Sequence, residues 1–342
     1  IQVNDGVNTN TWAPLTNDLI ITSYCANEPN VSLRFRWEVT DDDPNYGGGY
    51  GWQIDDIEIV DNPDVDMKLV DARMNFFEYI DYTQGGASDY FHISSHYGMI
   101  PYQQYGNDSA VMMFNGIIRN KGALDNTADF QVKVLSPTNT EVYNQSVTSP
   151  TLSTGQIDTL DLLTPEFTLD STAEPGLYTV VYNADIAADA NTADNADTTY
   201  FFIEDNEQFA RDLGNPISNL SPANWSSGGA DGEMVATDYL YMYETTVDDM
   251  GVYIGDDTEA GASIVGYLKE YNSNTDSWDD IMTTSLITID AADIDGWMQL
   301  QFPTPAQIIH SSGTRKNVKA AIEFYYGGEE LSIGYDPNVP VS

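Results

Sequence analysis

The sequence predicts an all-β protein built from tandem β-sandwiches, and three observations support this. Short runs that alternate apolar and polar residues recur along the 342 residues, separated by clusters of Gly, Pro, Asn and Asp. The composition favours strands, with 22 Tyr, 12 Phe and 6 Trp. No long stretch has the period of an amphipathic helix. A chain of this length is expected to divide into two or three such domains.

The alternating runs place the expected strands. The first is VSLRFRWEV, residues 31–39, in which every second residue is apolar. Later runs read the same way: DFQVKVL, GLYTVVYNADI, TYFFIED, MGVYIG, SIVGYLKEYN, WMQLQF and VKAAIEFYY. In WMQLQF, Met298, Leu300 and Phe302 share one face. If that face is buried, Trp297 points outward.

Two polar stretches are expected to be linkers between cores. One is DNPDVDM, residues 61–67, and the other is residues 204–222. They divide the chain into a jelly-roll fragment at 1–62, an Ig-like sandwich at 63–205 and a second jelly roll at 206–342. The first unit has too few strands to close a sandwich alone, so we expect it to be the end of a larger domain or to pack on a neighbour.

The charge balance excludes several classes of partner. Asp and Glu number 54 against 12 Lys and Arg, which gives a formal net charge of −42. Nucleic acid and anionic lipid would be repelled. No apolar run reaches membrane-spanning length, so membrane insertion is not expected. Cys25 is the only cysteine, which excludes an intrachain disulfide. The chain begins at Ile1 without a signal peptide, as expected of a mature or excised piece.

The end of the first unit carries a motif and an acidic cluster. The residues GWQIDDI, 51–57, follow a Gly-rich loop and resemble the closing strands of MAM-like jelly rolls of secreted bacterial proteins. The carboxylates of Asp41, Asp43, Asp55 and Asp56 are candidate ligands of a structural Ca²⁺, which prefers hard oxygen donors. A solvated turn accounts for the same residues. An EF-hand does not, because a loop begun at Asp41 has Tyr46 at its sixth position.

The other two units have resemblances of their own. The stretch MFNGIIRNKGALDNTADFQVKVLSP, with its turn at Asn120–Lys121–Gly122, and the later EPGLYTVVYNADI resemble CARDB-like Ig sandwiches of bacterial surface proteins. The residues from QFARDLG onward resemble the jelly rolls that follow such domains in modular proteins of Bacteroidota. These resemblances imply a type IX secretion substrate located outside the cell or on its surface.

Sequence motifs give no support for catalysis. There is no G-x-S-x-G elbow, phosphate-binding glycine loop or dinucleotide fingerprint. His92 and His96 lie four residues apart, but the first lacks the adjacent Glu of a zinc peptidase and the flanking sequence is β-like. We therefore expect no enzyme activity in this chain and interpret both histidines as packing or loop residues.

Two further sets of residues are candidate sites. Trp225, Trp278 and Trp297 could stack on sugar rings, although a tryptophan at a strand end that covers the sandwich edge is the simpler interpretation. Ser109 and Thr159 each follow an Asp and precede an apolar residue, which resembles the O-glycosylation acceptor of Bacteroidota secreted proteins.

The expected function is that of a non-catalytic extracellular surface component of the adhesin, filament or matrix type. Its expected partners are other surface proteins, copies of itself or glycans. Two alternatives stay open at this point. One is the accessory C-terminal region of a secreted hydrolase such as a metalloprotease, and the other is a carbohydrate-binding module on the last jelly roll.

Overall fold

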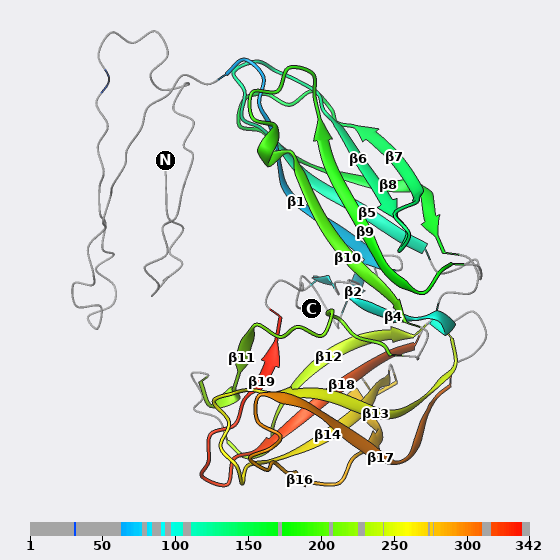
Figure 1. The fold of residues 1–342 in the computed structure, drawn as a ribbon, viewed down its shortest axis with the longest axis vertical. Coiled ribbons are helices and arrows are strands. Elements are labelled where there is room, and N and C mark those ends of the chain that lie inside the picture. The colour runs from blue at the N-terminus through cyan, green and yellow to red at the C-terminus, as the bar shows by residue number, and fades with distance from the viewer. Residues whose placement is uncertain are drawn as a thin grey trace.

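The computed structural model describes residue 31 and residues 63–76, 81–83, 90–92, 97–104, 111–169, 173–204, 208–224, 230–241, 243–272, 274–275, 277–309 and 316–336. In this part of the chain the regular structure is β-strand apart from the short 3-10 turns η1 (Tyr102–Gln104), η2 (Thr192–Asp194) and η3 (Pro222–Asn224). None of its helices is long and apolar enough to cross a membrane. The described strands form two β-sandwiches in tandem, which agrees with the predicted fold class (Figure 1). The jelly-roll fragment predicted at 1–62 lies outside the described residues apart from residue 31.

The first sandwich packs a three-stranded sheet against a five-stranded sheet. The smaller sheet has the order β1 (Met67–Phe76), β5 (Val111–Asn120), β8 (Ile157–Thr168). The larger has the order β4 (Met99–Pro101), β10 (Ala196–Glu204), β9 (Gly176–Asp185), β6 (Asp129–Leu135), β7 (Glu141–Thr148). Neighbouring strands are antiparallel except that β4 runs parallel to β10. This is an Ig-like arrangement, with a separate hairpin of β2 (Asp81–Thr83) and β3 (Tyr90–His92).

Aromatic side chains fill the core between these two sheets. The rings of Phe130 and Tyr182 stack with centroids 6.2 Å apart, and Phe114 meets Tyr182 edge-on. Burying an aromatic side chain of this size contributes about 1.5–3 kcal/mol. Gly116 of β5 lies directly against Phe130, because a Cβ atom at Gly116 would be 2.3 Å from Phe130 Cε2. Its lack of a side chain is what lets the two sheets approach there.

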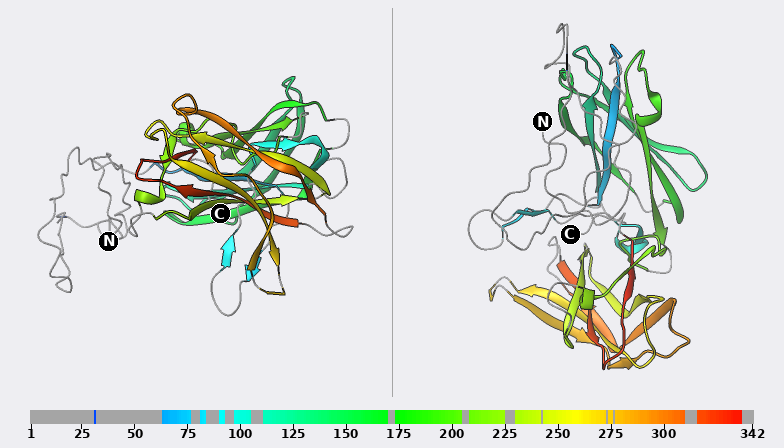
Figure 2. Two further views of the ribbon diagram at one scale, coloured as in Figure 1. Left: turned by 90° about the horizontal axis from the view of Figure 1, so that it is seen from below. Right: turned by 90° about the vertical axis from the view of Figure 1, so that its left-hand side faces the viewer.

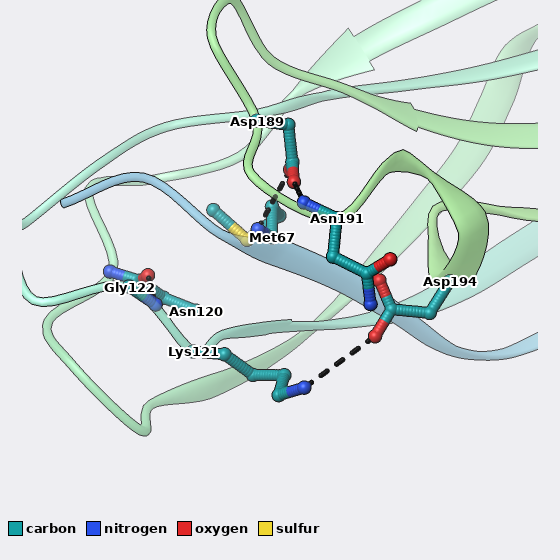
Figure 3. A network of polar contacts seen from close by, with 7 residues as sticks. All are labelled: Met67, Asn120, Lys121, Gly122, Asp189, Asn191 and Asp194. Carbon is teal, nitrogen blue, oxygen red and sulfur yellow. Dashed lines mark hydrogen bonds and ion pairs between the residues drawn. The ribbon is translucent and has the colours of Figure 1, made fainter. Parts of the chain in front are cut away.

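The start of β1 is held between two loops of the same sandwich (Figure 3). The backbone N–H of Met67 donates to Asp189 Oδ2 at 2.9 Å, and that of Asn191 donates to Asp189 Oδ1 at 2.8 Å. On the other side, the carbonyl oxygen of Asp66 accepts hydrogen bonds from the backbone N–H groups of residues 121 and 122. The prediction that residues 61–67 form a linker is therefore wrong for residues 63–67, because their backbone groups bond to the sandwich.

The second sandwich has the topology of a jelly roll. One sheet has the order β11 (Ser218–Leu220), β19 (Ile333–Tyr335), β13 (Thr245–Ile254), β17 (Gly296–Ile308). The other has the order β12 (Glu233–Tyr241), β18 (Lys316–Tyr325), β14 (Ser263–Asn272), β15 (Ser277–Thr283), with β16 (Ile287–Thr288) added beside β14. The first and last strands in sequence pair with each other, β11 with β19 and β12 with β18. The strands between them pair in the same way, β13 with β17 and β14 with β15. The predicted strands 263–272 and 129–135 coincide with β14 and β6.

The two sandwiches meet near β4 (Figures 1 and 2). Buried aromatic side chains form this junction. Tyr97 is 1% exposed, and its ring stacks on that of Phe209 with centroids 4.6 Å apart. The Arg211 guanidinium carbon lies 4.6 Å from the centroid of the Tyr97 ring. Phe209 in turn meets Tyr239 and Tyr241 of β12 edge-on, each at 5.2 Å. Phe209 thus packs against buried clusters of both sandwiches.

Hydrogen bonds reinforce the same junction. Gln104 is 1% exposed, and its amide exchanges two bonds with the backbone of Tyr243: Nε2 donates to the carbonyl at 3.4 Å and Oε1 accepts from N–H at 3.2 Å. Met99 and Ala210 exchange backbone bonds of 3.1 and 3.0 Å. The interpretation of residues 204–222 as a linker is therefore wrong for residues 209–211, which pack at the junction, and for residues 218–220, which form β11 of the second sandwich.

Candidate functional site

An aromatic corner lies on the outer face of the sheet that contains β13 and β17. In β17, Leu300 and Phe302 are buried while Trp297 is 50% exposed, so the tryptophan points outward as the alternation predicts. Tyr253 of β13 is directly opposite Trp297 in the ladder, and the rings meet at 80° with centroids 5.6 Å apart. The Tyr253 hydroxyl donates to Asp295 Oδ1 at 2.7 Å. This hydrogen bond raises the pKa of Tyr253, so its ring stays neutral.

Polar residues continue this face along both strands. Gln299 and Gln301 follow Trp297 at alternate positions of β17, each step being roughly 7 Å. Opposite them on β13 lie Gly251 and Asp249. Gln301 Nε2 donates to Asp249 Oδ2 at 2.8 Å. Among the residues that the structure describes, the amide of Gln299 has no hydrogen-bond partner, so it can both donate to and accept from a bound molecule.

Gly251 lies beside the side chains of Trp297 and Gln299. A Cβ atom placed there would lie 3.6 Å from Trp297 Cε3 and 3.6 Å from Gln299 Nε2, which is ordinary contact distance. The Trp297 ring and the Gln299 amide therefore lie against Gly251, which has no side chain to displace them. We name the set Asp249, Gly251, Tyr253, Trp297, Gln299 and Gln301 the β13–β17 face.

Trp278 lies on the other sheet of the same sandwich and is partly covered. The Lys319 Nζ atom is 4.3 Å from the centroid of the Trp278 ring, and Tyr271 packs at a tilt with centroids 5.5 Å apart. Lys319 also forms an ion pair with Asp238 at 3.8 Å. This cation–π contact occupies one side of the ring. The structure therefore separates Trp278 from Trp297, and the two do not form one site.

Several other predicted site residues cannot be placed. Asp41, Asp43, Asp55, Asp56, Trp225, Ser109 and His96 lie outside the described residues, and the side chain of His92 is also outside them. Thr159 is described: it is exposed on β8, an edge strand of the first sandwich. A modifying enzyme could reach its hydroxyl.

The described acidic loops do not gather into a metal centre. Within the described ranges, no group of three or more His, Cys, Asp or Glu side chains is placed to hold a metal ion. In the loop after β9, both carboxylate oxygens of Asp189 accept backbone hydrogen bonds (Figure 3). Lys121 lies 3.6 Å from Asp194 in the same network. These carboxylates serve the fold.

Comparison with known proteins identifies no family. No family model matches the chain, and no curated protein matches it. Solved structures with a resembling arrangement include a CARDB domain from Pyrococcus furiosus in complex with di-metal ions, at 11% identity and a TM-score of 0.26, covering 45% of this chain and 100% of that one. An immunoglobulin-like protein of Pseudomonas aeruginosa matches at 11% identity and a TM-score of 0.21, covering 41% of this chain and 98% of that one.

A third resembling structure is a β-glucosidase of Erythrobacter marinus. It is 11% identical, with a TM-score of 0.24 over 41% of this chain, and the match spans 16% of the enzyme. Likenesses this distant carry no conclusion about function. The Ig-like and jelly-roll assignments rest on the strand order and pairing of this chain.

Proposed function

We propose that this chain is a non-catalytic extracellular component of the adhesin, filament or matrix type, whose role is to hold two β-sandwiches in a fixed relative orientation. The junction around Tyr97, Phe209 and Gln104 is the observation that supports this. Domains of one chain move relative to each other unless their interface is large and apolar. Here Tyr97 and Gln104 are each 1% exposed at the junction.

The charge of the chain supports the same role. A net charge of −42 keeps separate molecules apart at low ionic strength, and salt or divalent cations would screen it where chains pack side by side. The expected partners are therefore other surface proteins, further copies of the chain, or glycans. Any Ca²⁺ requirement would depend on Asp41, Asp43, Asp55 and Asp56.

Two measurements on the purified chain test this proposal. The first is turnover of peptide, ester and glycoside substrates, and we expect none. The second is self-association and binding to cells, each measured with Ca²⁺ and with chelator. We expect self-association or cell binding to be measurable. Turnover that disappears when one carboxylate or histidine is substituted would contradict the non-catalytic role. A chain that stays monomeric and binds no cell would contradict the adhesive role.

A further inference from the structure

We propose that the β13–β17 face binds an uncharged saccharide, with a sugar ring stacked in the corner of Trp297 and Tyr253. This inference does not depend on the proposed structural role, because it concerns one face of the jelly roll and not the junction. It rests on the shape, the hydrogen-bonding capacity and the charge of that face.

The shape suits a flat ring that is apolar on one side. Trp297 is half exposed and meets Tyr253 at 80°, so the two rings form a corner and not a closed stack. Gly251 has no side chain, so the Trp297 ring and the Gln299 amide can lie against it side by side. A sugar ring presents C–H groups on its faces, and these pack favourably on an aromatic surface. A bulky side chain at residue 251 would push the Trp297 ring and the Gln299 amide out of these positions.

Hydrogen-bonding groups lie where the ring's hydroxyls would reach them. The Gln299 amide is adjacent to Trp297 on β17 and has no partner among the residues that the structure describes. The Gln301 amide and the Asp249 carboxylate bond to each other at 2.8 Å and keep further donor and acceptor capacity. Ligand sites combine apolar contact with a few polar groups that fix orientation, and this face has both.

The charge of the face selects against anions. None of its four strands, β11, β13, β17 and β19, contains Lys or Arg. Asp249 and Asp295 border the aromatic corner, and the whole chain carries −42. A uronic acid, sulfated sugar or phosphate would be repelled, so the ligand is neutral. On the opposite sheet, Lys319 covers Trp278, which leaves that ring less available for stacking.

The test is a binding measurement on the full chain with a panel of neutral oligosaccharides, made of β-glucan, xylan and mannan fragments, and an alginate fragment as the anionic comparison. Isothermal titration and tryptophan fluorescence would report binding. We expect saturable binding of at least one neutral member and none of alginate. Trp297→Ala should weaken binding about tenfold or more, since stacking residues dominate such sites. Gly251→Gln should do the same with Trp297 in place.

Trp278→Ala is the matched control, because it removes the same residue type from the same sandwich on the other sheet. It should leave binding unchanged, and circular dichroism should show all three variants folded. The proposal is overturned if no neutral saccharide binds, if alginate binds equally well, or if Trp297→Ala binds like the unmodified chain. Loss of a dimer in Trp297→Ala without any sugar binding would also overturn it and would assign the face to self-association.

Discussion

Asn120 is fully buried at the end of β5, and its side chain makes three hydrogen bonds to backbone groups. Nδ2 donates to the carbonyls of Leu124 at 2.8 Å and Leu152 at 2.7 Å, and Oδ1 accepts from Gly122 N–H at 2.9 Å. A Cβ atom on Gly122 would lie 2.8 Å from Asp64 O. The Asn-Lys-Gly turn therefore fixes how the chain enters the first sandwich.

Asn120→Asp tests this network at the scale of one residue. The new carboxylate cannot donate, so the carbonyls of Leu124 and Leu152 each lose one of their two donors and face a buried negative charge. We expect the free energy of unfolding to fall by about 2–4 kcal/mol. Asn126→Asp is the matched control, because Asn126 donates to the same Leu124 carbonyl at 3.1 Å from an exposed position. It should change stability by less than about 0.5 kcal/mol in urea titrations. Equal effects of the two variants would contradict the assignment.

At the scale of elements, Gly98, the residue before β4, lies against the segment between the domains. Its N–H donates to the carbonyls of Ala210 and Arg211, each at 3.1 Å, and its own carbonyl accepts from Phe202 N–H at 2.7 Å. A Cβ atom at Gly98 would lie 2.3 Å from the carbonyl carbon of Asp212. That contact is with backbone, so no side-chain rotation can relieve it.

Gly98→Ala should therefore open the junction while each sandwich keeps its own core. We expect calorimetry to show one transition for the unmodified chain and two for the variant. X-ray scattering should show a broader distribution of inter-domain distances. Gly251→Ala is the control, since a Cβ atom there meets nothing closer than 3.6 Å. A Gly98→Ala protein that unfolds in one transition and keeps its scattering profile would show that the junction is not what fixes the domains.

The alternating strands could be predicted from sequence, and elements without alternation could not. β14 has Ile264, Gly266 and Leu268 inward, so its period of two is visible. β1 is absent from the predicted strands, because a bulge between Leu69 and Asp71 breaks its alternation and leaves Val70 exposed.

The junction and the β13–β17 face depend on which strands become neighbours. The outward direction of Trp297 follows from β17 alone, but its pairing with Tyr253 requires the register of two strands that are distant in sequence. In the same way, Tyr97, Phe209 and Tyr239 come from three separate segments. No local period encodes these contacts, so sequence reasoning found Trp297 and missed the residues around it.

At the scale of the whole molecule, the surplus of carboxylates should oppose folding at neutral pH. Glu259 and Glu329 are one place where two of them meet. The hydrogen bond with Glu259, together with the repulsion between the two charges, raises the pKa of Glu329 above its ordinary value of 4.5. The folded chain therefore binds this proton more tightly than the unfolded chain. The stability that this bound proton gives the folded chain is complete below pH 4.5 and is lost as pH rises through the raised pKa of Glu329.

Glu329→Gln should consequently raise the melting temperature at pH 7 and low salt, because it replaces a repelled carboxylate by an amide that can donate to Glu259. The gain should vanish near pH 4, where the carboxyl is protonated in both states. It should also shrink in about 1 M salt, where the Debye length falls to about 3 Å. Glu330→Gln is the matched control, since it removes one charge from the same loop and leaves the pair intact. If Glu330→Gln raised the melting temperature as much as Glu329→Gln, the gain would come from the net charge of the molecule and not from this contact.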